Sequence, residues 1–224
     1  MRKYIIPIFA IFQKDFKSEL RTRYALNALA MFVVTTISII LFAIANETPS
    51  YEILAGILWI IIFFSAMSGM ARTFVSEEEK NTVMTLHTIT TPVTVYFGKF
   101  LFNLILLIVI NSFSIILYML LMPNFEIKSP DIFIVTLALG TFGLASTSTI
   151  IAAIIAKSNT KGTLYPVLSF PILLPLLLVV IKATKLALEG EIFSKALPDF
   201  QVMLAYFVVI TAGSYLLFDY IWKD

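Results

Sequence analysis

The chain has 224 residues but no cysteine, a single histidine and few charged side chains, which make up only 13% of the sequence. Disulfides, thiolate metal sites and cysteine nucleophiles are therefore excluded. His87 alone cannot supply a His-His metal pair. No G-x-x-x-x-G-K-[ST] phosphate-binding loop occurs, so any ATP that the protein uses must be bound by another chain. The net charge of +2 gives no nucleic-acid footprint. Together these absences argue against an enzyme, which needs an acid, a base or a nucleophile held in a site.

What the sequence does contain is long apolar runs: 59% of the residues are hydrophobic, and the mean hydropathy is +0.95. Six runs lack Asp, Glu, Lys and Arg and come near the length of about 20 residues that a helix needs to cross a bilayer. We therefore predict an all-α integral membrane protein with one transmembrane domain over residues 1–224. The predicted spans are residues 25–45, 53–71, 100–122, 132–156, 164–181 and 200–218.

Residues 1–24 predict an amphipathic helix ahead of the first span. Its apolar positions recur at spacings of three and four, with Lys14, Lys17 and Arg21 between them. Such a helix suits the headgroup plane of a membrane, where it contacts lipid. The alternative is an ordinary helix that packs on the cytoplasmic side of the protein itself. The apolar positions are Ile5, Ile8, Phe9, Phe12, Phe16 and Leu20.

The distribution of basic residues predicts the orientation. With the N-terminus inside, the outer loops hold four of the 16 Lys and Arg residues, namely Lys128, Lys182, Lys185 and Lys195, and the inner segments hold the rest. Short cytoplasmic loops carry such an excess of positive charge. Both termini are therefore expected to be cytoplasmic.

The inner connector between the second and third spans is the most polar part of the chain. Residues 72–86 predict a short helix parallel to the membrane, with the sequence EEEK at residues 77–80. Val83, Leu86 and Ile89 recur every three residues and offer an apolar edge to a partner. A solvated charged face is the alternative, but the connector is long for a simple link. We therefore expect a soluble partner to dock here.

Prolines mark the fifth span, where Pro166, Pro171 and Pro175 lie within ten residues. Each removes a backbone donor and clashes with the preceding turn, which predicts a kinked or broken helix. Such a helix is either a conformational hinge or a static irregularity. Beyond it, residues 182–199 predict a short helix in the outer loop that ends at Pro198.

Small residues mark the fourth span, notably Gly140 and Gly143 on either side of Thr141. Small side chains let membrane helices approach closely, and mild polar groups join them by hydrogen bonds. We interpret these three residues as helix-packing positions, and the alternative is that the polar groups line a transport route.

A series of short motifs runs from one end of the chain to the other. These are Lys14-Asp15, Glu19-Leu20-Arg21, Arg72-Thr73-Phe74, the acidic run with Thr82, Pro92, Gly98-Lys99, Leu139-Gly140-Thr141 with Gly143, Lys161-Gly162 and the three prolines. In their order and spacing the chain resembles the CcmB family, the haem exporter permeases of cytochrome c maturation. Two departures concern residues 81 and 84, because family members commonly have Gly where Asn81 stands and often an acid where Met84 stands.

The resemblance implies the fold of an ABC export permease in the bacterial inner membrane. Such a permease pairs with a second copy of itself and with two copies of the ATPase CcmA, and it works with CcmC, CcmD and the haem chaperone CcmE. ATP on the partner subunit would drive haem export or release the haem-loaded chaperone, and this chain would bind no cofactor tightly. There are two alternatives: the chain is a permease for a lipid, drug or polysaccharide, or it is a passive scaffold without transport. The coupling helix that docks the ATPase would use Arg72, Phe74, Glu77, Glu78, Glu79, Thr82 and Leu86.

Overall fold

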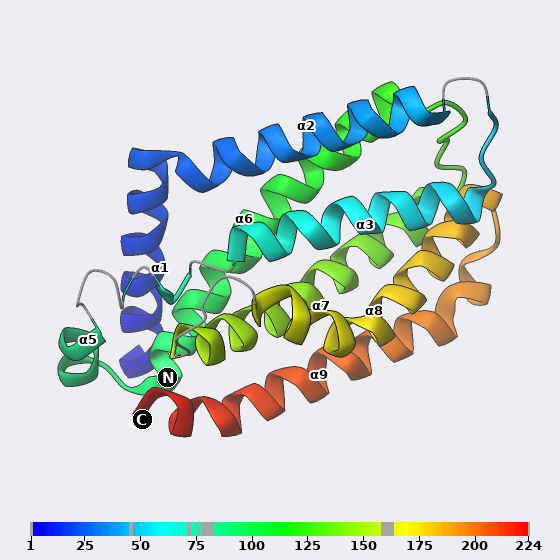
Figure 1. Ribbon diagram of the computed structural model, residues 1–224. Helices are drawn as coiled ribbons and strands as arrows, with labels where there is room; N and C mark the ends of the chain where they lie inside the picture. Colours follow the sequence, from blue (N-terminus) through cyan, green and yellow to red (C-terminus); the bar gives the residue numbers. More distant parts are fainter. Residues whose placement is uncertain are drawn as a thin grey trace.

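The computed structural model describes residues 2–44, 47–70, 73–75, 77, 83–157 and 164–223, and every regular element in these ranges is a helix (Figure 1). Six of the helices, α2, α3, α6, α7, α8 and α9, are long and apolar enough to cross a membrane. The predicted all-α membrane fold is therefore confirmed. The helices are α1 (Arg2–Thr22), α2 (Tyr24–Ile44), α3 (Tyr51–Met70), α5 (Val83–Ile89), α6 (Pro92–Leu121), α7 (Pro130–Ala156), α8 (Leu164–Glu189) and α9 (Phe193–Lys223).

Helix α7 forms the centre of the bundle and packs against α3, α6, α8 and α9. A Cβ added to Gly140 would collide with the ring of Trp59, and one added to Gly143 would lie 2.7 Å from Leu176. The Trp59 indole uses this space to donate a 2.8 Å hydrogen bond to Thr184 of α8. The two glycines thus let α3 and α8 approach α7 closely.

The third residue of this group, Thr141, joins α7 to α6. Its hydroxyl accepts a 3.0 Å hydrogen bond from the side-chain amide of Asn111. Both residues are buried. Because no water is present in the hydrocarbon region of a membrane, each polar group there needs a protein partner. The hydrogen bond therefore holds α6 and α7 together inside the bundle.

Helix α8 is continuous through Pro171 and Pro175, so the prolines do not break it. Both prolines are exposed at the surface of the bundle, and Pro166 lies in the same helix with its side chain outside the described part. The Tyr206 hydroxyl donates a 3.0 Å hydrogen bond to the carbonyl of Ile172, between the two exposed prolines. An α9 side chain thus binds backbone in the same turn in which Pro175, which lacks an N–H, cannot donate to the carbonyl four residues before it.

The prediction of a separate short helix over residues 182–199 is wrong. Helix α8 continues to Glu189, and α9 begins at Phe193, so only three residues separate them. Gly190 ends α8 with a φ of +82°, a conformation that glycine adopts without strain. Pro198 lies inside α9 and does not end a helix.

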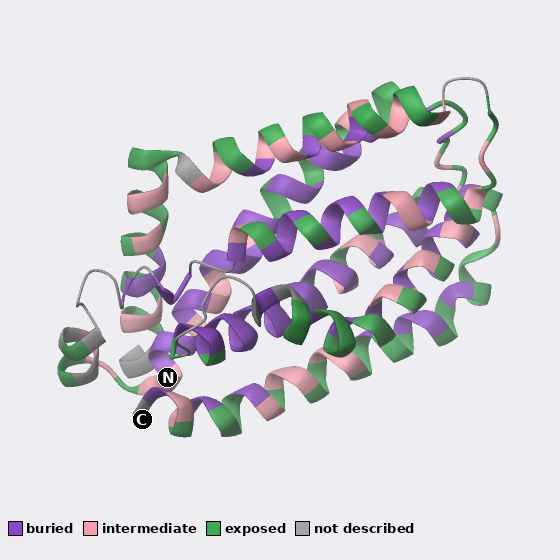
Figure 2. Cartoon of the chain, in the orientation of Figure 1, coloured by how far each residue is buried: buried purple, intermediate pink, exposed green. Residues whose placement is uncertain are grey.

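Helix α1 lies across the ends of the spanning helices, at the end of the bundle that also holds α5 and both termini (Figure 1). Arg23 makes the bend between α1 and α2 with a φ of 51°. Helix α1 carries both buried and exposed positions (Figure 2). Ile11 and Phe12 are buried against the bundle, whereas Ile5 and Phe9 remain exposed. Packing on the protein and contact with the membrane surface are thus compatible for this helix, because one face is buried against the bundle and another is exposed.

Candidate functional site

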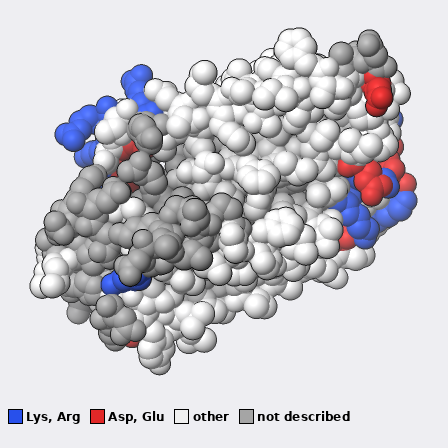
Figure 3. Space-filling model, in the orientation of Figure 1, with Lys and Arg blue, Asp and Glu red and all other residues white. Residues whose placement is uncertain are grey.

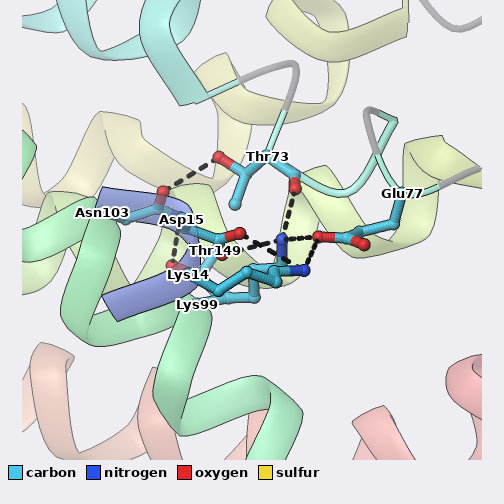
Figure 4. Close-up of polar contacts among 7 residues, drawn as sticks. All are labelled: Lys14, Asp15, Thr73, Glu77, Lys99, Asn103 and Thr149. Carbon is cyan, nitrogen blue, oxygen red and sulfur yellow. Dashed lines mark hydrogen bonds and ion pairs between the residues drawn. The ribbon is translucent and has the colours of Figure 1, made fainter. Parts of the chain in front are cut away.

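The connector between α3 and α6 begins in a cluster of four charged side chains (Figure 4). Two of them are buried, one is partly exposed and one is exposed. Glu77 of the connector forms an ion pair with Lys99 of α6, with 2.7 Å between Oε1 and Nζ. Lys99 also lies 2.9 Å from Oδ2 of Asp15 in α1, and Lys14 of α1 pairs with Glu77. We call Lys14, Asp15, Glu77 and Lys99 the ion cluster. It joins one connector residue to two helices.

Charge balance explains how Lys99 and Glu77 of the ion cluster can be buried. It contains two ammonium groups and two carboxylates, and Lys99 is only 1% exposed and Glu77 4%. A single charge at this depth would carry a desolvation cost of several kcal/mol, which only close opposite charges and hydrogen bonds offset. Lys99 Nζ donates a further 3.0 Å hydrogen bond to the carbonyl of Thr73. The cluster is therefore held as a unit, and loss of one member leaves an uncompensated charge.

Hydrogen bonds extend from the connector into the bundle. The Thr73 hydroxyl donates to Oδ1 of Asn103 in α6 at 2.9 Å, and Nδ2 of Asn103 donates to the Thr149 hydroxyl of α7 at 2.9 Å. Asn103 and Thr149 are fully buried. The start of the connector is thus linked through α6 to the central helix.

An aromatic cluster holds the same segment against the end of α9. The Phe74 ring lies 5.7 Å from the ring of Phe218 and 6.3 Å from that of Trp222. Lys99 Nζ lies 5.7 Å from the Phe74 ring centroid, close enough for a cation–π contact. Phe74 is 2% exposed, so it anchors the connector in the core.

The later part of the connector, α5, projects from the end of the bundle (Figure 1). Met84 is 79% exposed and Ile89 is 74% exposed, while Leu86 is half-buried against the core. Met84 and Ile89 offer apolar surface outside the candidate spans. Of the expected apolar edge, Ile89 therefore faces outward and Leu86 partly inward, and the side chain of Val83 lies outside the described part of the chain.

The residues expected to dock a partner fall into three groups. Phe74 and Glu77 are buried anchors, and docking residues would have to be exposed. Leu86 lies beside the exposed positions of α5. The remaining four, Arg72, Glu78, Glu79 and Thr82, lie outside the described residues.

Sequence reasoning missed the other half of this site. Lys14 and Asp15 enter the family resemblance, but the sequence predicts no contact between them and the connector, and Lys99 falls just before the third predicted span. The available signal was a lysine in an apolar segment directly before the span, which calls for an opposite charge nearby.

In the described part of the chain, the side chains that could ligate a metal ion do not gather in one place, and both tryptophans are enclosed. No group of three or more His, Cys, Asp or Glu side chains among these residues could hold a metal ion. Trp59 and Trp222 are both buried among neighbouring helices. Neither ring is available at the surface for a flat ligand.

The comparisons with known proteins agree with the geometry. No curated protein matches the chain. A family model described as CcmB protein matches residues 6–220, which include five whole candidate spans, most of the sixth, the ion cluster and α5. The match covers almost the whole sequence. The chain therefore belongs to the CcmB family, the permease subunits of the ABC transporter for haem export in cytochrome c maturation.

Proposed function

We propose that the connector is the coupling element through which the ATPase subunit drives this permease. An ABC transporter of this family has an ATPase partner, and we identify it as CcmA. It would bind residues 72–91 on the cytoplasmic face, with Arg72, Glu78, Glu79 and Thr82 as polar contacts. The permease itself would be non-catalytic, because ATP is hydrolysed on the partner.

The observation that carries this proposal is the attachment of the connector to the bundle. Glu77 contacts α1 and α6 through the ion cluster, and Phe74 contacts α9 through its aromatic neighbours. Thr73 reaches α7 through Asn103. A force on the connector would therefore act on four helices at once. A connector that was only a solvated loop would not need such anchors.

The exposed apolar side chains of α5 suggest how the ATPase binds. Met84 and Ile89 would enter an apolar groove on the partner, as amphipathic helices commonly do. When ATP closes the ATPase dimer, the two connectors would be drawn together. The anchored helices would then rearrange toward the opposite side of the membrane.

The wider assembly follows from the same proposal. Two copies of this chain would pair with two copies of CcmA, and CcmC, CcmD and the haem chaperone CcmE would join them in the bacterial inner membrane. ATP hydrolysis would export haem or release the haem-loaded chaperone. The excess of basic residues in the segments assigned to the inside supports cytoplasmic termini. Pro166, Pro171 and Pro175 remain candidate hinge residues for the rearrangement.

Co-purification tests the docking step. Met84→Glu with Ile89→Glu should reduce recovery of the ATPase subunit from detergent at least tenfold, because both charges would enter an apolar contact. The matched control is Ile192→Glu, which changes a side chain that is 69% exposed at the other end of the bundle. The control should retain the ATPase. Equal recovery with both variants would contradict docking at α5.

A second experiment separates coupling from a passive scaffold. An ATPase subunit with its catalytic glutamate replaced should still co-purify with this permease, but cells should no longer make holo-cytochrome c. Normal holo-cytochrome c in that strain would show that the permease acts as a scaffold without needing ATP hydrolysis.

A further inference from the structure

Helix α1 lies where a bilayer surface would meet the bundle. It runs across the ends of the spanning helices, and the bend at Arg23 leads directly into the apolar run of α2 (Figure 1). The first candidate span begins at Ala25, only three residues after α1 ends. The helix therefore lies level with the end of the hydrocarbon region, where lipid headgroups are found.

The surface of α1 divides into three faces. One face packs on α6: Ile11 and Phe12 are buried, and a Cβ added to Gly98 would lie 2.8 Å from Ile11. A second face is apolar and exposed. The third is basic, with Lys17 and Arg21 one turn apart. The exposed apolar face consists of Ile5 (60%), Ile6 (62%), Phe9 (48%), Phe16 (37%) and Leu20 (48%).

Charge complementarity identifies what covers the two free faces. Lys17, Arg21 and Arg23 are exposed, and none has an ion-pair partner among the described residues. Basic side chains gather at the corner where α1 meets α2, whereas the opposite end of the bundle mixes acidic and basic groups (Figure 3). An apolar face beside a basic face fits acyl chains below and anionic headgroups above.

The same helix holds the coupling segment. Asp15 lies 2.9 Å from Lys99, and Lys14 pairs with Glu77, so α1 contributes half of the ion cluster. Lys17 and Lys14 are one turn or less apart on this helix. A shift of α1 at the membrane surface would therefore displace Glu77 through Lys14, because the helix is rigid over so short a distance.

We propose that α1 binds the anionic lipid headgroups of the membrane and that this contact sets the position of the connector, so that anionic lipid raises the ATPase rate of the assembled transporter. The proposal rests on the proposed function, because it assumes that the ATPase acts through the connector. Lipid binding and coupling are then linked through Lys14 and Asp15.

The test uses the whole complex in nanodiscs made of phosphatidylcholine alone or with phosphatidylglycerol added, at the same ionic strength. The wild-type complex should hydrolyse ATP roughly threefold faster or more in the anionic discs, and added salt should reduce this difference. Lys17→Gln with Arg21→Gln should abolish the stimulation. Lys17→Arg with Arg21→Lys keeps both charges and should retain it.

A second variant tests transmission through the ion cluster. Lys14→Gln with Asp15→Asn removes one charge of each sign, so the Lys99–Glu77 pair stays balanced while α1 loses its hold on it. This complex should still assemble but lose the lipid stimulation. Stimulation equal to wild type in this variant, or in Lys17→Gln with Arg21→Gln, would overturn the proposal.

The two proposals fail in different ways. A complex that lacks the ATPase when α5 is intact would contradict the proposed function. A complete complex whose ATPase rate is the same in neutral and anionic discs would overturn the lipid proposal alone. That result would also follow if another protein subunit covered the free faces of α1.

Discussion

The ammonium nitrogen of Lys99 lies 2.7 Å from a carboxylate oxygen of Glu77, although 22 residues separate them in the chain. Lys99 belongs to α6, and Glu77 belongs to the connector that precedes it. Neither is more than 4% exposed. The pair closes the connector against the helix that follows it, and Asp15 and Lys14 bring α1 into the same contact.

Removal of Lys99 alone should be strongly destabilising. Lys99→Met leaves two carboxylates facing one partly exposed lysine, and breaking a buried pair in this way costs about 3–5 kcal/mol. Adding Glu77→Gln restores the charge balance, so the double variant should be more stable than the single one. The thermal unfolding midpoint of the detergent-solubilised protein, followed by tryptophan fluorescence, measures both effects.

The control for the Lys99 variants is Lys195→Met. Lys195 also forms an ion pair, with Glu191, but its side chain is 53% exposed. Exposed pairs contribute about 1 kcal/mol or less, so the midpoint should hardly move. Equal losses from Lys99→Met and Lys195→Met would show that burial of the cluster does not matter.

Truncation of the aromatic anchor should loosen the connector. Phe74→Ala removes a buried ring from its contacts with Phe218 and Trp222, which should cost about 3–5 kcal/mol. Phe42→Ala is the matched control, since that ring is 80% exposed on α2. Limited proteolysis should cut the connector faster in Phe74→Ala than in Phe42→Ala, and identical digestion rates would argue against an anchor.

Hydropathy was enough to predict six spans, because a bilayer requires long apolar helices. It did not predict where the helices end. A scan for uncharged runs stops at Lys99 and before Asp199, yet α6 begins at Pro92 and α9 at Phe193. Both helices continue because tertiary partners neutralise these charges: Glu77 pairs with Lys99, and Lys182 lies 2.8 Å from Asp199.

The candidate site was predictable in position but not in structure. The acidic run at residues 77–80 indicated a functional connector, since charge is rare in this chain. Its first glutamate, however, points inward. The sequence could not show this, because its partner Lys14 is 63 residues away and no local pattern reveals that contact. Similarly, Gly140 was predicted at a helix contact, but only the fold identifies Trp59 as its neighbour.

That neighbour gives a third prediction. Gly140→Ala places a methyl group where the Trp59 ring lies, so α3 and α7 must separate, and we expect a loss of about 1–3 kcal/mol from overpacking. Gly56→Ala is the matched control, because nothing lies within 4 Å of the added carbon. It should be neutral or stabilising by up to about 1 kcal/mol, since alanine has a higher helix propensity than glycine. Thermal unfolding of both variants in one detergent makes the comparison, and a lower midpoint for Gly56→Ala than for Gly140→Ala would contradict this packing.

The absence of native cysteine makes the orientation directly measurable. Met84 of α5 and Ile192 between α8 and α9 are 79% and 69% exposed, and they lie at opposite ends of the bundle (Figure 1). In intact cells a membrane-impermeant maleimide should label Ile192→Cys but leave Met84→Cys unlabelled, because basic residues favour the cytoplasm for the end that holds α5. Permeabilised cells should label both variants, which controls for thiol access within the folded protein. If Met84→Cys reacted in intact cells and Ile192→Cys did not, α5 would face away from the cytoplasm, and no cytoplasmic ATPase could then reach the connector to act on Glu77.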